Sequence, residues 1–165
     1  VRIAFGALPR TEIEAALEQR GTADAGAAAA LADGSLGRAC VLAAEGLTLR
    51  DDALALLAEL PSLSVENIWT RAEAIGARTH AERTEWLGFL QMALRDLLIL
   101  HEGGTVPLYH QDRRTDLTAL LPRMARAQLF DLLRGTRELQ RRFGANVNPA
   151  LQAEAFLLRA RKQFT

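Results

Sequence analysis

The residue of this chain best placed for chemistry is an arginine at the start of a predicted helix. Arg38 follows two glycines and a serine in the run Gly34-Ser35-Leu36-Gly37-Arg38. An arginine held at the first turn of a helix can reach a phosphate. The same residues also serve as ordinary punctuation, because glycine ends one helix and serine caps the next. Both interpretations stay open at this point.

Arginines also form a stripe on a helix predicted from about residue 125 to 143. Arg126, Arg134, Arg137 and Arg141 lie away from its apolar side. Residues 1–110 hold 9 basic and 15 acidic side chains, whereas residues 111–165 hold 11 and 5. This asymmetry fits contacts of Arg134, Arg137 and Arg141 with a nucleic-acid backbone, or a solvated, ion-paired surface. No aromatic side chain is expected among the arginines, although stacking on single strands would need one.

The remaining reactive side chains match no known catalytic or metal-binding pattern. His80, His101 and His110 lack metal-ligand spacing, and no serine or cysteine lies in a nucleophile elbow. The phosphate-binding loop Gly-x-x-x-x-Gly-Lys-Ser/Thr is absent, and Lys162 is the only lysine. We therefore expect no catalytic residue, no metal and no cofactor in this chain alone. A phosphate that Arg38 meets must be held by a domain outside it.

Composition predicts an all-α fold. The 165 residues are 49% hydrophobic but only 5% aromatic, and leucine and alanine dominate; this is typical of packed helices. The single cysteine, Cys40, is expected to be a buried small hydrophobe. No apolar run is long enough to span a membrane and the start lacks a secretory signal, so we expect a cytoplasmic protein.

Caps and breakers predict three short helices near the start of the chain. A capping box at Thr11-Glu12-Ile13-Glu14 predicts the first helix, and helices at 23–32 and 36–45 follow. Three short helices with small side chains bury too little to be stable alone, so they need another body to rest on.

A helix predicted from Thr84 to His101 is apolar nearly all round, so we expect it at the centre of a helical bundle. An earlier helix carries Ile68, Trp69, Ala72 and Ile75 as its apolar residues, and Asn148 with Pro149 begins the last helix of the chain. Alternation of Val1, Ile3 and Phe5 predicts a strand. Because a lone strand lacks partners, we expect the chain to be the C-terminal part of a longer protein.

The run Gly34-Ser35-Leu36-Gly37-Arg38-Ala39 resembles a signature in the helical lid of bacterial clamp-loader subunits, above all the delta-prime subunits of DNA polymerase III. Residues 1–9 resemble the family's passage from its ATPase-like domain into the lid. Asn146-Val147-Asn148-Pro149, with Leu151, Glu154 and Leu157-Leu158 after it, resembles the entry into the last helix of its collar domain.

The resemblance implies an AAA+ lid-like domain of three helices at 1–47 and a collar domain at 48–165. The collar would be a bundle of about five helices that associates with the collars of other clamp-loader subunits. Such assemblies load the sliding clamp on primed DNA, so contact of this chain with DNA would be indirect, and no membrane is involved. Arg38 would be the family's sensor 2 arginine, with Gly34, Ser35 and Gly37 completing a nucleotide-binding motif. Since delta-prime subunits often lack a working ATP site, the role of Arg38 stays open between sensor and salt-bridge residue.

Two alternatives remain. The chain resembles, less well, the collar region of the ATP-hydrolysing gamma or tau subunit, whose lid motif usually has an aspartate where this chain has Ala39. It could also be a stand-alone helical DNA-binding module that uses the arginines from Arg126 to Arg142. None of the three functions makes this chain an enzyme by itself.

Overall fold

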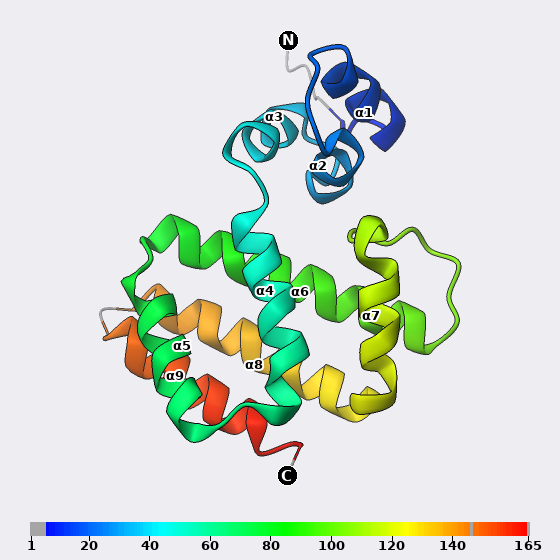
Figure 1. The fold of residues 1–165 in the computed structure, drawn as a ribbon. Helices are drawn as coiled ribbons and strands as arrows, with labels where there is room; N and C mark the ends of the chain where they lie inside the picture. Colours follow the sequence, from blue (N-terminus) through cyan, green and yellow to red (C-terminus); the bar gives the residue numbers. More distant parts are fainter. Residues whose placement is uncertain (1–5, 146, 165) are drawn as a thin grey trace. The chain divides into compact units, whose positions relative to one another are not determined.

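The computed structural model describes residues 6–145 and 147–164, and within them the protein is all-α, as predicted (Figure 1). These residues form nine α-helices and three short 3-10 helices joined by loops, with no strand among them. The strand predicted from Val1, Ile3 and Phe5 lies outside the described residues.

The chain divides into two compact units. Residues 6–48 and the segment Val106–Arg114 form the first unit, and Leu49–Thr105 with residues 115–164 form the second. The boundary predicted at 47/48 does not account for Val106–Arg114, a later segment that belongs to the first unit. In this segment Leu108 is buried, and the Tyr109 hydroxyl donates to Asp33 at 3.2 Å. The identification of these units as lid and collar stays a prediction.

The first unit is built from three short helices with small buried side chains. Its core consists mainly of alanine and leucine together with Ile13, and side chains of this size let helix backbones approach closely. The helices are α1 (Arg10–Glu18), α2 (Ala25–Leu31) and α3 (Leu36–Glu45), and η2 (Gln111–Arg113) lies in the returning segment.

The capping box predicted at Thr11 is wrong. Helix α1 begins two residues earlier than the capping box predicts, at Arg10, with Pro9 at the N-cap and no side-chain capping bond. The carbonyl of Pro9 accepts from the amides of Glu12 and Ile13. Because proline fixes φ and its carbonyl starts the helical ladder, Thr11 falls inside the first turn, where its hydroxyl cannot cap.

The second unit is a bundle around α6, whose residues Trp86, Leu87, Phe89, Leu90, Ala93, Leu94 and Leu97 are at most 1% exposed. This confirms the prediction that this helix is central. Helix α5 packs along α9, and α6 packs along α8 (Figure 1). The helices are α4 (Thr48–Glu59), α5 (Val65–Ala77), α6 (His80–His101), α7 (Arg114–Leu120), α8 (Arg126–Phe143) and α9 (Pro149–Arg161), with η1 (Leu60–Ser62) and η3 (Leu121–Arg123) as short connections.

Helix ends in the bundle follow cap chemistry. Asn148 accepts from the amides of Ala150 and Leu151 at 2.9 and 3.3 Å, confirming the predicted start of α9. Gly76 of α5 lets the first turn of α9 pack closely against α5, since a Cβ at Gly76 would lie 2.6 Å from the Cβ of Ala150. Helix α6 begins four residues before the predicted Thr84, because Thr79 and Glu82 form a capping box.

A partly buried carboxylate joins three helices of the bundle. Asp52 of α4 accepts from the guanidinium of Arg71 at 2.8 Å, from Arg78 at 2.7 Å and from the indole nitrogen of Trp86 at 3.0 Å. Arg71 also donates to Glu59 at 2.7 Å. Since Asp52 is only 26% exposed, these charge-assisted bonds fix how α4, α5 and the start of α6 pack.

Replacing Asp52 with alanine should destabilise the chain by about 2 kcal/mol, because two guanidinium groups and an indole lose a shared acceptor. Chemical denaturation at neutral pH measures the loss. The matched control is Asp131→Ala, which removes a carboxylate that is 50% exposed and paired with the exposed Arg134, and should cost less than about 1 kcal/mol. Equal losses in the two variants would contradict this account of Asp52.

The capping box of α6 should make stability depend on pH. The Thr79 hydroxyl and amide both donate to the Glu82 carboxylate, which lowers the Glu82 pKa from its ordinary value of 4.5, with help from the charge of Arg78. This contribution is present above the unfolded-state pKa and is lost as pH falls through the lower folded-state pKa.

The stability difference between the wild type and Glu82→Gln should therefore be present at neutral pH and disappear in acid. Denaturation midpoints across a pH series measure it, with Glu73→Gln as a control for the loss of one exposed carboxylate. A difference that grows as the pH falls would show that Glu82 does not act through its charge.

Candidate functional site

The predicted phosphate-binding run begins helix α3. Ser35 is the N-cap, and its hydroxyl accepts from the amide of Arg38 at 3.3 Å. Gly34 has a φ of +82°, and its carbonyl accepts from the amide of Leu8 at 2.9 Å. The predicted helix and its capping serine are thus confirmed, and the run does serve as punctuation between α2 and α3.

Arg38 lies half-buried on the first turn of α3. Within residues 6–145 and 147–164 its guanidinium makes no hydrogen bond and no ion pair. The alternative role as a salt-bridge residue therefore has no partner in this part of the chain. An arginine beside the first amides of a helix, which lack intrahelical acceptors, is an arrangement that can contact an anion.

The two glycines of the run differ in what they do. A Cβ at Gly34 would lie 2.4 Å from the Cβ of Ala7, so this glycine is required by packing as well as by its positive φ. A Cβ at Gly37 would meet nothing within 4 Å, and the residue is exposed. Gly37 thus packs against none of the residues that the structure describes, and among them the first turn of α3 is open on that side.

Cys40, on the next turn of α3, is half-buried. The prediction that it is a buried residue is therefore wrong. Arg20 donates to its sulfur at 2.8 Å, in a shallow hollow lined by Leu17, Arg20, Thr22, Cys40, Ala43 and Ala44. The small residues around the thiol leave it partly open, which the apolar pattern of the helix could not reveal.

The predicted arginine stripe lies on the outer side of α8. Arg134 pairs with Asp131 at 2.8 Å, and Arg126 pairs with Glu102 at 3.2 Å. Arg137 and Arg141 are exposed and make no ion pair within the part of the chain that the structure describes. The structure therefore places all three predicted nucleic-acid residues, Arg134, Arg137 and Arg141, on one accessible side of the helix.

An aromatic residue belongs to this stripe, which corrects the prediction that none does. Phe130 is 46% exposed, and the guanidinium of Arg126 lies 5.6 Å from the centre of its ring. The sequence held the signal, because positions 126, 130, 134, 137 and 141 are three or four residues apart and so share one face of a helix.

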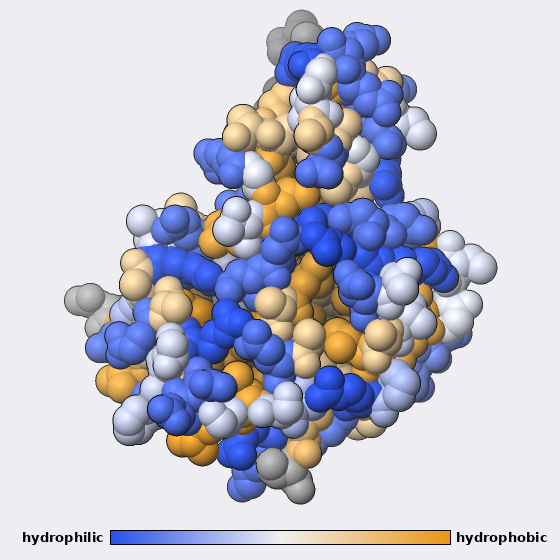
Figure 2. Space-filling view, viewed as in Figure 1, coloured by the Kyte–Doolittle hydropathy of each residue, from blue (hydrophilic) through white to orange (hydrophobic). Residues whose placement is uncertain are grey.

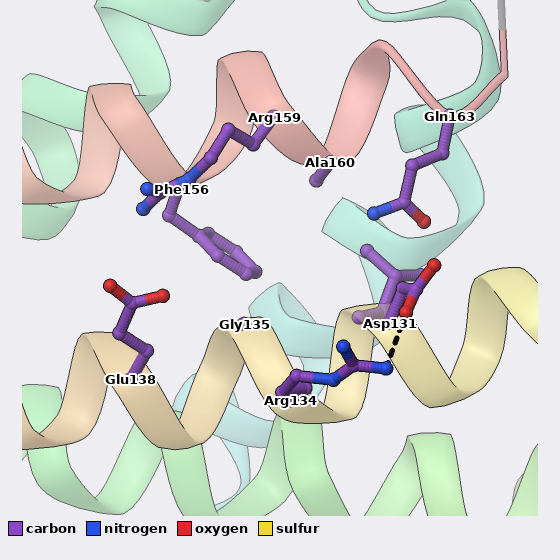
Figure 3. Close-up of a pocket in the computed structure, with 9 residues that line it drawn as sticks. Asp131, Arg134, Gly135, Glu138, Phe156, Arg159, Ala160 and Gln163 are labelled. Carbon is purple, nitrogen blue, oxygen red and sulfur yellow. Dashed lines mark hydrogen bonds and ion pairs between the residues drawn. The ribbon is translucent and has the colours of Figure 1, made fainter.

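A hollow between α8 and α9 borders the stripe (Figure 3). The ring of Phe156 extends from α9 toward Gly135 of α8, while Arg159 and Glu138 lie to one side of it. At about 190 Å³ the hollow is smaller than the usual cofactor site. It is a packing gap between two helices and does not resemble a cofactor pocket.

An apolar surface lies on α5 and α9. Trp69 is 62% exposed, Leu151 58%, Val65 49% and Leu158 40%. The indole nitrogen of Trp69 donates to Glu154 of α9 at 3.0 Å, which ties the two helices together at the surface. We call these four residues the α5–α9 apolar face; Figure 2 shows apolar surface among polar surface over the region of these helices.

The exposure of Trp69 corrects the prediction that it shares the apolar stripe of its helix. Ile68, Ala72 and Ile75 are at most 2% exposed and lie within a narrow arc of α5. Trp69 lies about 100° away from Ile68 around the helix axis, so the core side cannot include it.

Among the described residues, no three histidine, cysteine, aspartate or glutamate side chains are grouped so that they could hold a metal ion. None of their helices is long and apolar enough to cross a membrane.

Comparison with models of known protein families finds no match, and a search of curated proteins finds no similar sequence.

Replacing each glycine of the α3 run with alanine should show which of the two is needed for stability. Gly34→Ala should destabilise the chain by about 2 kcal/mol, through its positive φ and the overlap with Ala7. Gly37→Ala should be neutral or stabilise by up to about 1 kcal/mol, because it meets open space in a helix. Thermal or chemical denaturation measures both. A loss at Gly37 as large as that at Gly34 would show that Gly37 has a packing role after all.

Proposed function

We propose that this chain is the lid and collar part of a clamp-loader subunit of the delta-prime type, acting as a scaffold without catalysis of its own. The support is the set of motif residues that resemble the family, from Gly34 to Ala39 and from Asn148 onward. Ala39 favours delta-prime over the ATP-hydrolysing gamma or tau subunits, whose lid motif usually has an aspartate there. In this function the chain assembles with the other loader subunits that place the sliding clamp on primed DNA.

The observation that carries the proposal is the α5–α9 apolar face. An exposed tryptophan on a surface that also carries exposed aliphatic side chains is the composition of a binding hot spot, and tryptophan is enriched at such sites. The hydrogen bond from Trp69 to Glu154 holds the indole in place before binding. A side chain that is already ordered loses less entropy on association, so the face is suited to a stable protein partner.

Assembly through this face uses burial of apolar surface as its main source of affinity. Arginine and carboxylate pairs around the face would favour one neighbour over another, because unmatched charges are costly to bury. Arg38 would act separately, by contacting a phosphate bound by a domain that this chain does not contain. The scaffold thus joins helix surfaces and leaves nucleotide hydrolysis to other parts of the assembly.

Replacing Trp69 with alanine should weaken association with the other loader subunits by at least about tenfold, since a central aromatic is removed from the interface. Sedimentation or isothermal titration of the full chain with those subunits measures the Kd. Trp69→Phe, which keeps an aromatic ring but loses the indole donor, should recover part of the affinity.

The matched control is Phe130→Ala, which removes an aromatic of comparable exposure from the outer side of α8, and it should leave the Kd of assembly unchanged. Circular dichroism verifies that both variants remain folded. If the wild-type chain binds none of the loader subunits, or if Trp69→Ala binds them as the wild type does, the proposed function is wrong.

A further inference from the structure

The outer side of α8 forms a single cationic line with one aromatic residue in it. Arg126, Phe130, Arg134, Arg137 and Arg141 fall within an arc of about 80°, at 100° per residue, and extend about 22 Å along the helix. All five are exposed. We call them the arginine face. The core residues Leu129, Leu132, Leu139 and Phe143 occupy the opposite side of α8 and are at most 6% exposed.

The carboxylates near this line pair with two of its four arginines. Asp131 and Glu102 each engage one arginine of the face, Arg134 and Arg126. Glu138 lies on the neighbouring row and is engaged by Arg142, which is not part of the face. Arg137 and Arg141 therefore keep their charge available at the end of the line, among the residues that the structure describes.

The pKa of Glu138 supports this view of the local charge. Its hydrogen bond and charge interaction with Arg142 lower the pKa, and the charges of Arg159 and Arg141 lower it further. A carboxylate held ionised by several guanidinium groups indicates a positive potential over this part of α8 and α9.

Phe130 decides which polyanion fits the arginine face. Its ring is exposed between Arg126 and Arg134, and the Arg126 guanidinium lies over it. A base of a single strand can stack on such a ring while the flanking phosphates meet arginines on either side. Duplex DNA would use the arginines but not the ring, because its bases are already stacked. An acidic protein surface would likewise leave the ring without an aromatic partner.

We propose that the arginine face of α8 binds single-stranded nucleic acid, with Arg134, Arg137 and Arg141 on phosphates and Phe130 stacked on a base. This adds direct contact to the indirect contact with DNA expected of a loader scaffold. It does not depend on the assembly function, since the face belongs to one helix of the chain alone.

The test uses the full chain and a fluorescently labelled oligothymidylate, with binding followed by anisotropy across a salt series. The double variant Arg137→Gln/Arg141→Gln should bind about tenfold more weakly at low salt. Its plot of log K against log salt should lose about 1.4 from the slope, since each phosphate contact on a single strand contributes about 0.7. Phe130→Ala should weaken binding about tenfold with an unchanged slope, and Phe130→Trp should restore it.

The matched control is Arg142→Gln, which removes the same charge from the same helix but from a residue paired with Glu138, and it should change binding by less than about twofold. Trp69→Ala should bind oligothymidylate as the wild type does. This result keeps a failure here separate from a failure of the assembly proposal, and circular dichroism verifies that each variant is folded.

Three results would each overturn the proposal. An effect of Arg142→Gln equal to half that of the double variant would show that net charge alone governs binding. Tighter binding to a duplex than to oligothymidylate would exclude a role for base stacking. Displacement of oligothymidylate by polyglutamate at equal charge concentration would identify the face as a surface for acidic protein.

Discussion

The packing of the bundle depends on the Asp52 carboxylate. It accepts from Arg71, Arg78 and Trp86, and these groups belong to α5, to the residue after α5 and to α6. A single acceptor shared by three donors restricts the relative position of three helices, because hydrogen bonds to a charge are directional. Two of these helices carry or adjoin the candidate faces, since α5 packs along α9 and α6 packs along α8.

The two faces of the bundle differ in chemistry although they share a core. Trp69 and its aliphatic neighbours on α5 and α9 can be buried against protein with little desolvation cost. The arginines of α8 are better suited to a partner that keeps water and salt between the charges. The proposed functions use these two faces, whereas the charged groups around Asp52 join α4, α5 and α6.

Local features were predictable from the sequence. Ser35 before α3, Asn148-Pro149 before α9 and the apolar pattern of α6 all depend on side chains within one or two turns. The starts of α3 and α9 and the central place of α6 could therefore be predicted from the sequence. Two local errors also have local causes. Helix α1 starts before Thr11 because Pro9 is its N-cap. Helix α6 starts before Thr84 because Thr79 and Glu82, three residues apart in the sequence, form a capping box.

Long-range features could not be predicted in this way. Trp86 reaches Asp52 from 34 residues away, and no periodicity links the two positions. The return of Val106–Arg114 to the first unit is likewise invisible to local patterns. The exposed position of Trp69 follows from helix geometry, but a tryptophan next to core residues invites assignment to the core. Of the candidate site, the sequence supplied Arg38 and the α8 arginines, and the structure added Phe130 and the α5–α9 apolar face.

Hydrogen–deuterium exchange of the full chain, alone and mixed with the other subunits of a clamp loader, tests the proposed scaffold function most directly. The account predicts slower amide exchange in α5 and α9 on mixing, because a partner covers Trp69 and the residues around it. Unchanged exchange in both helices would contradict it.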